Sequence, residues 1–463
     1  MRPALQPQYG YWWLAEAPDE RTSGVLEADT HGKLTLTLYG RLGTHVSASG
    51  WVQGARRILG EVDMGVLVSL DRCFVKQTPG DFGLERQIWV VHDALIGAKF
   101  DAEEPWAFCG ASFDMPLLTQ WTGTRNIEDF LDRNDCDRAT HLGIAVARRK
   151  WPLWQHDGVE VDLCLSGSVR EISETTSVLE GAVRLRANAQ KALTREQFRE
   201  IAIRPLQVLI ALATGQFTAA ISADVQQGPR VPESPPAELP WYWQPLTISP
   251  ADLRVQFGFH YGDVLALGAD RFQVWIATHT PLDPVFDLYL GLLRQTGLAE
   301  LSFLMVVQAL ETYHRRTGTD TILATSTWDP LREEIAAVIT AAKTGPAEQG
   351  LLNKLTFYNE VSLRYRLKAL LRPLAGVGDE ITGQSGSNFV NAVVATRNYY
   401  THWDAKSESA ALRGEALVYA TSRLTALLEI LLLRDIGFAS DSPAWIEILR
   451  RRARWLPTSV EGR

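Results

Sequence analysis

The segment from Arg397 to Asp404, with the sequence RNYYTHWD, carries the residue types best suited to chemistry on a phosphate. An arginine offers a planar fork of donors and stays charged. A histidine that titrates near neutrality can take or give a proton. His402 lies five positions after Arg397, so on an ideal helix the two side chains would point about 140° apart. We expect the helix to end near Tyr400, which would bring His402 beside Arg397. The pair could then serve acid–base catalysis on a phosphate, or could be a structural pair that satisfies the helix end.

Other side chains could support such a site. Glu311 could orient Arg397 or could be an ordinary surface acid. Basic residues gather in two stretches that could contact phosphate or simply form a solvated face. The first stretch holds Arg364, Arg366, Lys368 and Arg372, and the second holds Arg450, Arg451, Arg452 and Arg454. The aromatic residues Tyr399, Tyr400 and Trp403 could pack inside the protein or stack on nucleic-acid bases.

These residues form two sets of candidates. The candidate catalytic residues are Arg397, Asn398, His402 and Glu311. The candidate nucleic-acid contacts are Arg364, Arg366, Lys368, Tyr400 and Arg451.

The sequence lacks the usual metal and nucleotide motifs. It contains no GxxxxGK[ST] loop and no HExxH, and no GxGxxG follows a predicted strand. The nine histidines are scattered, and the four cysteines lack the spacing of a zinc site. Glu160 and Asp162 lie in a strand-like run, but no ExK partner follows them, so a metal-dependent nuclease of that type is not supported. We therefore predict no metal and no cofactor.

Composition is typical of a globular protein of two or three domains. The chain has 463 residues, of which 46% are hydrophobic and 22% are charged. Its formal net charge of −8 does not predict nucleic-acid binding, but the acidic excess lies before residue 286 and the remainder is near neutral. Few cysteines indicate free thiols and a cytoplasmic protein. The apolar run Leu424–Leu433 is short and contains Glu429, so we predict no membrane span.

Residues 1–285 read mainly as strands. Leu34, Leu36 and Leu38 alternate with polar residues, and Val25–Ala28 could be the hairpin partner. Further strands are expected at Gly65–Val75, Gln87–Val91, Trp106–Phe113, Gly143–Ala147, Val159–Leu165 and Val178–Leu185, then at Leu253–Phe259 and Phe272–Ile276. Because few helices intervene, we expect an antiparallel sheet or sandwich.

One helical segment, at 194–221, interrupts these strands. Thr194 and Gln197 have capping-box spacing, and Pro205 should kink the helix. The stretch 229–250 is rich in proline and is expected to be a loop, not a central strand.

Residues 286–463 read as a helical bundle, which makes the chain an α+β protein. The expected helices are 286–316 with a break near Gly297, 329–343 capped by Asp329, 351–371, 385–400, 407–433 and a short basic helix at 442–455. The helix at 407–433 carries one apolar stripe, which is typical of a helix that packs against the core of a bundle.

Several segments together resemble a known family. RNYYTH matches the R-x4-6-H signature of HEPN domains, with Asn398 in the polar position after the arginine. The helix containing FLMVVQALETYHR (303–315) resembles the opening helix of ApeA-like HEPN domains. YWWL (11–14), SGVL (23–26), the strand at 33–39 and the pair Phe113 and Trp121 resemble the ApeA N-terminal domain.

The resemblance implies an anti-phage protein of the abortive-infection type with a metal-independent ribonuclease domain. The 2′-OH of RNA would attack the adjacent phosphate and leave a 2′,3′-cyclic phosphate and a 5′-OH. HEPN domains pair, which implies a homodimer or higher oligomer with RNA, transfer RNA among the candidates, in a shared cleft. The phage trigger is unknown.

Two other functions stay open from the sequence. One is a non-catalytic HEPN module for RNA binding or oligomerisation, resembling an antitoxin. The other is a ligand-binding β-domain with a helical dimerisation tail.

Overall fold

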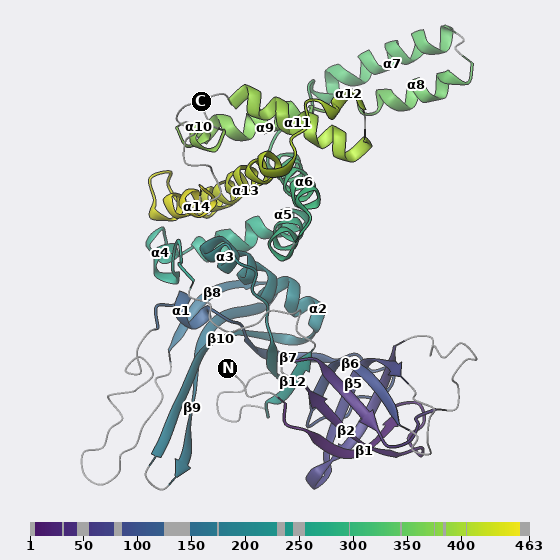
Figure 1. The fold of residues 1–463 in the computed structure, drawn as a ribbon, viewed down its shortest axis with the longest axis vertical. Coiled ribbons are helices and arrows are strands. Elements are labelled where there is room, and N and C mark those ends of the chain that lie inside the picture. The colour runs from purple at the N-terminus through teal and green to yellow at the C-terminus, as the bar shows by residue number, and fades with distance from the viewer. Residues whose placement is uncertain are drawn as a thin grey trace. The chain divides into compact units, whose positions relative to one another are not determined.

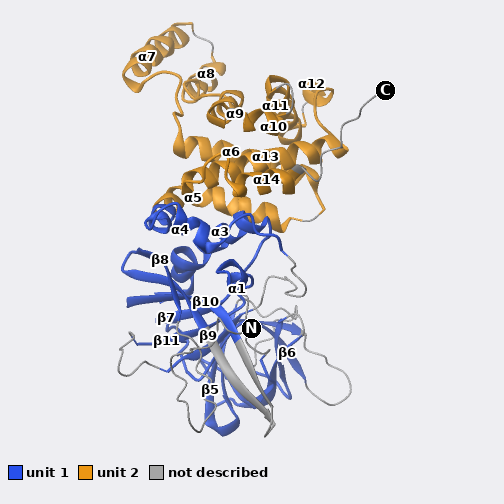
Figure 2. Ribbon diagram, turned by 90° about the vertical axis from the view of Figure 1, so that its left-hand side faces the viewer, with its two compact units in different colours: residues 1–276 blue, residues 277–463 orange. Residues whose placement is uncertain are grey.

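The computed structural model describes most of the chain as two compact units, residues 1–276 and 277–463 (Figure 2). The described residues are 5–29, 32–43, 55–77, 86–124, 149–173, 176–228, 237–243, 255–295, 297–342, 345–374, 376–382, 386–403 and 405–453. The division between the units falls within helix α5 (Arg271–Arg294), whereas the sequence had suggested a boundary at 285/286. The expected strand at 143–147 lies outside the described residues.

The first six strands form a closed antiparallel barrel (Figure 1). They are β1 (Gln8–Leu14), β2 (Thr22–Ala28), β3 (Leu34–Leu38), β4 (Arg56–Val62), β5 (Val66–Gln77) and β6 (Gln87–Ile96). Their order is β3-β2-β1-β4-β5-β6, and β3 also pairs with β6, which closes the ring. The predicted hairpin is confirmed, with Leu26 opposite Leu36. Alternate residues of these strands fill the interior, among them Trp12, Leu36 and Trp89.

The remaining strands continue the same sheet beyond β6 in the order β12-β11-β7-β10-β9-β8. They are β7 (Ala107–Asp114), β8 (Lys150–His156), β9 (Val159–Ser173), β10 (Thr176–Thr194), β11 (Ser222–Gln226) and β12 (Leu239–Trp243). The expectation that 229–250 holds no central strand is wrong, because β12 lies between β6 and β11. The sheet tolerates Pro240 because the ladder with β6 begins only at Trp241.

Helices complete the first unit. They are α1 (Leu118–Trp121), α2 (Arg195–Phe198), α3 (Arg204–Thr214) and α4 (Tyr261–Ala266). The predicted capping box is present: the Gln197 amide donates to the Thr194 hydroxyl, and the Gln197 side chain accepts from the Thr194 N–H. A π-helical turn at Arg199–Ile203 precedes Pro205, which stands in the first turn of α3 and lacks an amide proton to donate.

The strands expected at 253–259 and 272–276 are absent from the described part of those segments. Residues 255–259 have no regular structure, and 272–276 lie in α5. Phe272, Trp275 and Ile276 are all buried, at helical spacing. Three apolar residues at positions i, i+3 and i+4 occupy one face of a helix, a pattern that the short apolar run concealed.

The second unit is a helical bundle, so the predicted α+β class is confirmed. Besides the second part of α5, its helices are α6 (Ala299–Thr317), α7 (Thr325–Ala341), α8 (Ala347–Leu355), α9 (Leu363–Leu371), α10 (Val377–Thr382), α11 (Gly386–His402), α12 (Ala405–Glu408), α13 (Gly414–Ile436) and α14 (Pro443–Ala453). The break predicted near Gly297 separates α5 from α6, where Gly297 has a φ of 102°. The single helix expected at 351–371 is two helices, and α7 begins before Asp329, with Pro330 inside it.

Helix α13 forms the centre of the bundle. Its apolar residues are buried on several sides, and it packs against α6 and α14. Among the described residues, α13 alone is long and apolar enough to cross a membrane, with a mean hydropathy of 1.6 in its most apolar window. Because 72% of that window is buried, the helix also fits the core of the bundle.

Candidate active site

Helix α11 carries the Arg397, Asn398 and His402 side chains, and it ends later than the sequence suggested. The helix continues to His402. Trp403 then adopts a left-handed conformation with φ of 51°, and its amide donates to the Tyr399 carbonyl at 2.5 Å. The expected end near Tyr400 is therefore wrong. Helical geometry turns the Arg397 and His402 side chains about 140° apart, and no hydrogen bond or ion pair joins them among the described residues.

An aromatic cluster supports this helix end. Tyr399, Tyr400 and Trp403 lie edge to face, with ring centroids 5.1–5.9 Å apart. The Arg413 guanidinium stacks over Tyr399, and the Tyr400 hydroxyl donates to the Leu412 carbonyl at 3.3 Å. These contacts are packing contacts within the chain, although Trp403 remains 69% exposed. Burial, with a smaller contribution from Glu300, raises the pKa of the Tyr400 hydroxyl above its ordinary value.

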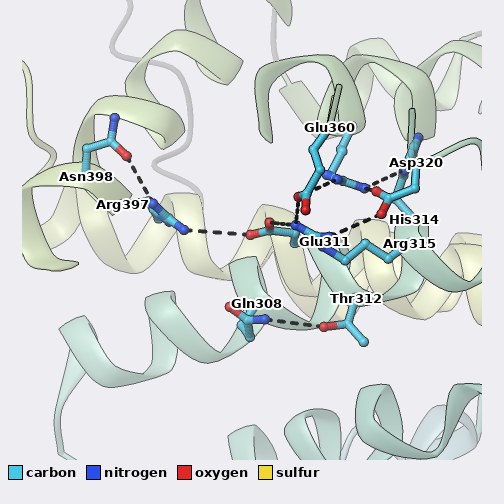
Figure 3. A network of polar contacts seen from close by, with 10 residues as sticks. Gln308, Glu311, Thr312, His314, Arg315, Asp320, Glu360, Arg397 and Asn398 are labelled. Carbon is cyan, nitrogen blue, oxygen red and sulfur yellow. Dashed lines mark hydrogen bonds and ion pairs between the residues drawn. The ribbon is translucent and has the colours of Figure 1, made fainter. Parts of the chain in front are cut away.

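Arg397 is held by two neighbours and remains partly open to solvent (Figure 3). One terminal nitrogen, Nη1, donates to the Asn398 side-chain oxygen at 3.3 Å. The other, Nη2, lies 3.9 Å from Glu311 Oε2 on α6. The Arg397 side chain is 31% exposed and that of Glu311 only 13%. The guanidinium is thus oriented by a carboxylate while part of it still faces solvent, where it could meet a phosphate.

Glu311 also belongs to a larger network of charges. Its other oxygen, Oε1, lies 3.3 Å from Arg315, one turn along α6. Arg315 further contacts Asp320 at 3.2 Å and Glu360 at 2.8 Å. Asp320 and Glu360 flank the segment that contains α7 and α8, where Thr321 and Glu360 form an isolated antiparallel bridge. Figure 3 shows this network continuing from Asn398 and Arg397 through Glu311 to Arg315.

Arg366 is the interior end of the same network, which does not fit its predicted contact with nucleic acid. Its side chain is fully buried and forms an ion pair with Asp320. One nitrogen also lies 3.3 Å from Nδ1 of His314. Burial and then the charge of Arg366 lower the pKa of His314, so the imidazole is neutral in the folded protein at neutral pH. A guanidinium packed in this way is not available to a phosphate at the surface.

The other predicted nucleic-acid contacts are of two kinds, exposed and internally paired. Arg364 and Lys368 are exposed on α9 and could meet a phosphate. Arg451 instead contacts the carboxylate of Glu429 at 3.2 Å, and its side chain is only 16% exposed. Arg452 pairs with the same carboxylate, and the Tyr289 hydroxyl donates to it at 2.8 Å. Arg451 therefore belongs to the packing of α14 on α13.

Sequence reasoning missed the residues that surround Glu311. The spacing of Glu311 and Arg315 is an ion-pair signal on a helix and could have been found. Asp320 and Glu360 join the network from distant positions, so no local pattern reveals them. Among the described residues, no group of three or more histidine, cysteine, aspartate or glutamate side chains could hold a metal ion.

Two models of known protein families match the chain. A family model described as Apea-like HEPN matches residues 304–442, which include Glu311, Arg397 and His402. A second model, described as ApeA N-terminal domain 1, matches residues 8–260, more than half of the chain.

The chain belongs to the ApeA family. This result confirms the resemblance seen in the sequence and makes the chain an anti-phage defence protein with a C-terminal HEPN domain. HEPN domains are typically ribonucleases. No protein with a curated description and no solved structure is significantly similar to the chain.

Proposed function

We propose that this ApeA-family protein is a metal-independent endoribonuclease whose active site is built from Arg397, Asn398 and His402. The proposal rests on the orientation and exposure of the Arg397 side chain. Its guanidinium is oriented by Glu311 and Asn398 yet remains partly exposed, next to the end of α11, where His402 is exposed. These residues lie within the segment that matches the HEPN family model.

The chemistry follows from the side chains. RNA carries its own nucleophile, because the 2′-OH lies beside the phosphate to be cleaved. His402 would remove the 2′-OH proton or protonate the leaving 5′-oxygen, a contribution of about 10²–10⁴-fold. Arg397 would donate to the phosphoryl oxygens, where negative charge grows in the transition state. The products would be a 2′,3′-cyclic phosphate and a 5′-OH, and DNA would resist.

A second copy of the chain would complete the site. Because α11 runs unbroken from Arg397 to His402, one chain does not turn both side chains to one face. Two copies related by a twofold axis would present two arginines and two histidines to one cleft. The protein would therefore act as a homodimer, and a monomer would be inactive.

The remaining parts of the proposal concern regulation and substrate. An abortive system needs a nuclease that is silent before infection, and the β-rich unit would sense the phage trigger. The substrate would be cytoplasmic RNA, with transfer RNA one candidate. Exposed Arg364 and Lys368 would add contacts to the RNA backbone.

Induced expression in bacteria tests the proposal. Wild type should be toxic and should generate new RNA 5′-OH ends, which sequencing maps to preferred sites. His402→Ala should abolish both effects. Thr401→Ala, which changes the exposed residue beside it, serves as the matched control and should behave as wild type. Cleavage by His402→Ala at the wild-type rate would remove His402 from the mechanism.

One observation favours a second candidate, a non-catalytic HEPN module that binds RNA or assembles with other chains. No hydrogen bond or ion pair joins Arg397 and His402 among the described residues of the single chain. Under this alternative, wild type would bind RNA or form oligomers and would produce no 5′-OH ends.

A further inference from the structure

Arg315 is the residue that connects the candidate site to the rest of the charge network. It approaches three carboxylates, those of Glu311, Asp320 and Glu360, at 2.8–3.3 Å. Figure 3 shows Asp320 on the side of Arg315 away from Arg397, and Glu360 above the contact between Arg315 and Glu311. These two carboxylates therefore hold the Arg315 guanidinium in place independently of its contact with Glu311.

Glu311 divides its two oxygens between two arginines. Oε1 faces Arg315 at 3.3 Å, and Oε2 faces Arg397 at 3.9 Å. The distance to Arg397 exceeds that of a normal hydrogen bond, so this contact is mainly Coulombic. The carboxylate is mostly buried, which makes its need for a positive partner stronger than at an exposed site.

From this geometry we propose that Arg315 is a positioning residue for the ribonuclease site. By neutralising Glu311 from the far side, it keeps Glu311 from forming a close ion pair with Arg397. Arg397 then stays oriented but free to donate to a phosphate. The catalytic consequence of this inference rests on the proposed function. The effect of Arg315 on the position of Arg397 does not depend on that function.

Removing Arg315 should have a specific result. In Arg315→Ala, Arg397 becomes the one cation paired with Glu311 among the described residues, and the two side chains close into a tight pair. The arginine then loses donors that the transition state needs, so kcat should fall about 10-fold, with a smaller change in KM. Arg316→Ala is the matched control, because Arg316 is exposed and, within the described part of the chain, its side chain donates only to the Pro281 carbonyl, at 3.4 Å.

A double variant separates positioning from simple structural support. Glu311→Gln combined with Arg315→Ala removes the carboxylate that would capture Arg397, while the contacts of Arg315 with Asp320 and Glu360 are still lost. The positioning role predicts that the double variant is more active than Arg315→Ala alone. A structural role predicts that it is equally impaired or worse, because it lacks at least as many contacts.

A second readout does not depend on cleavage. Phenylglyoxal modifies accessible guanidinium groups, and peptide mass spectrometry can follow Arg397 by itself. Modification of Arg397 should be several-fold slower in Arg315→Ala than in wild type and should recover in the double variant. If wild type cut no RNA but this pattern appeared, the proposed function would be refuted and the positioning of Arg397 supported. Equal reactivity of Arg397 in all three proteins would overturn the inference.

Discussion

Replacing Glu429 by glutamine should strongly destabilise the helical unit. The side chain is fully buried in α13 and accepts from the Tyr289 hydroxyl at 2.8 Å. It also pairs with Arg451 and Arg452 of α14. Burial opposes its ionisation, but the two arginines outweigh this effect and hold the pKa of the carboxyl below its ordinary value. Glutamine keeps the shape of the side chain and removes the negative charge that the two guanidinium groups share.

The size of the effect follows from the burial. Breaking a buried ion pair by removing one partner costs about 3–5 kcal/mol, because the remaining charge is left uncompensated. For a unit of this size, that cost lowers Tm by roughly 6–20 °C. Glu408→Gln is the matched control: Glu408 also pairs with an arginine, Arg413, but both side chains are more than half exposed. Its Tm should equal that of wild type.

Thermal unfolding followed by circular dichroism measures both variants in the full chain. Hydrogen exchange of peptides from α14 then locates the loss, which should be concentrated where Arg451 and Arg452 lie. Replacing Glu429, Arg451 and Arg452 together by methionine should recover much of the stability, since an apolar cluster has no charges to desolvate. A Tm for Glu429→Gln within 2 °C of wild type would contradict the reasoning.

Three further predictions concern the candidate site and its surroundings. Arg397→Lys should reduce kcat about 100-fold without lowering Tm, because a lysine cannot present the same fork of donors; steady-state kinetics and a melting curve check this. Arg364→Ala should weaken RNA binding and flatten its salt dependence, whereas the buried Arg366→Ala should instead lower Tm; binding titrations at two salt concentrations separate them. The pKa of His314 is lowered in the folded state, so this residue adds to the loss of stability as pH falls below about 6.5. His314→Gln should reduce that loss, measured by denaturant titrations at several pH values. The same dependence of stability on pH in His314→Gln and wild type would contradict this prediction.

Local patterns predicted the parts of the fold that local forces determine. The alternation around Leu36 predicted the hairpin of β2 and β3, and Thr194 with Gln197 predicted a helix start that the structure confirms. Gly297 marked the break between α5 and α6, where a glycine adopts the observed positive φ at little cost. The closure of the barrel by β3 and β6 could not be foreseen, because it joins strands far apart in the sequence.

The candidate site was also predicted only where local sequence patterns determine it. The sequence identified Arg397, Asn398 and His402 as a set, but it misplaced the end of α11, since a tryptophan in left-handed conformation ends the helix where a glycine would be expected. It treated Arg366 as a surface residue because its ion-pair partner, Asp320, is distant in the sequence. Tertiary contacts of this kind decide which arginines are free to meet RNA.

The most direct test of the account is the dependence of cleavage on the 2′-OH. Purified wild-type protein should cut RNA in the presence of EDTA and leave 2′,3′-cyclic phosphate ends. A substrate with a single 2′-deoxynucleotide on the 5′ side of the mapped scissile phosphate should resist at that position, and His402→Ala should be inactive on either substrate. Cleavage of the 2′-deoxy substrate at the unmodified rate, or loss of all activity in EDTA, would contradict the mechanism.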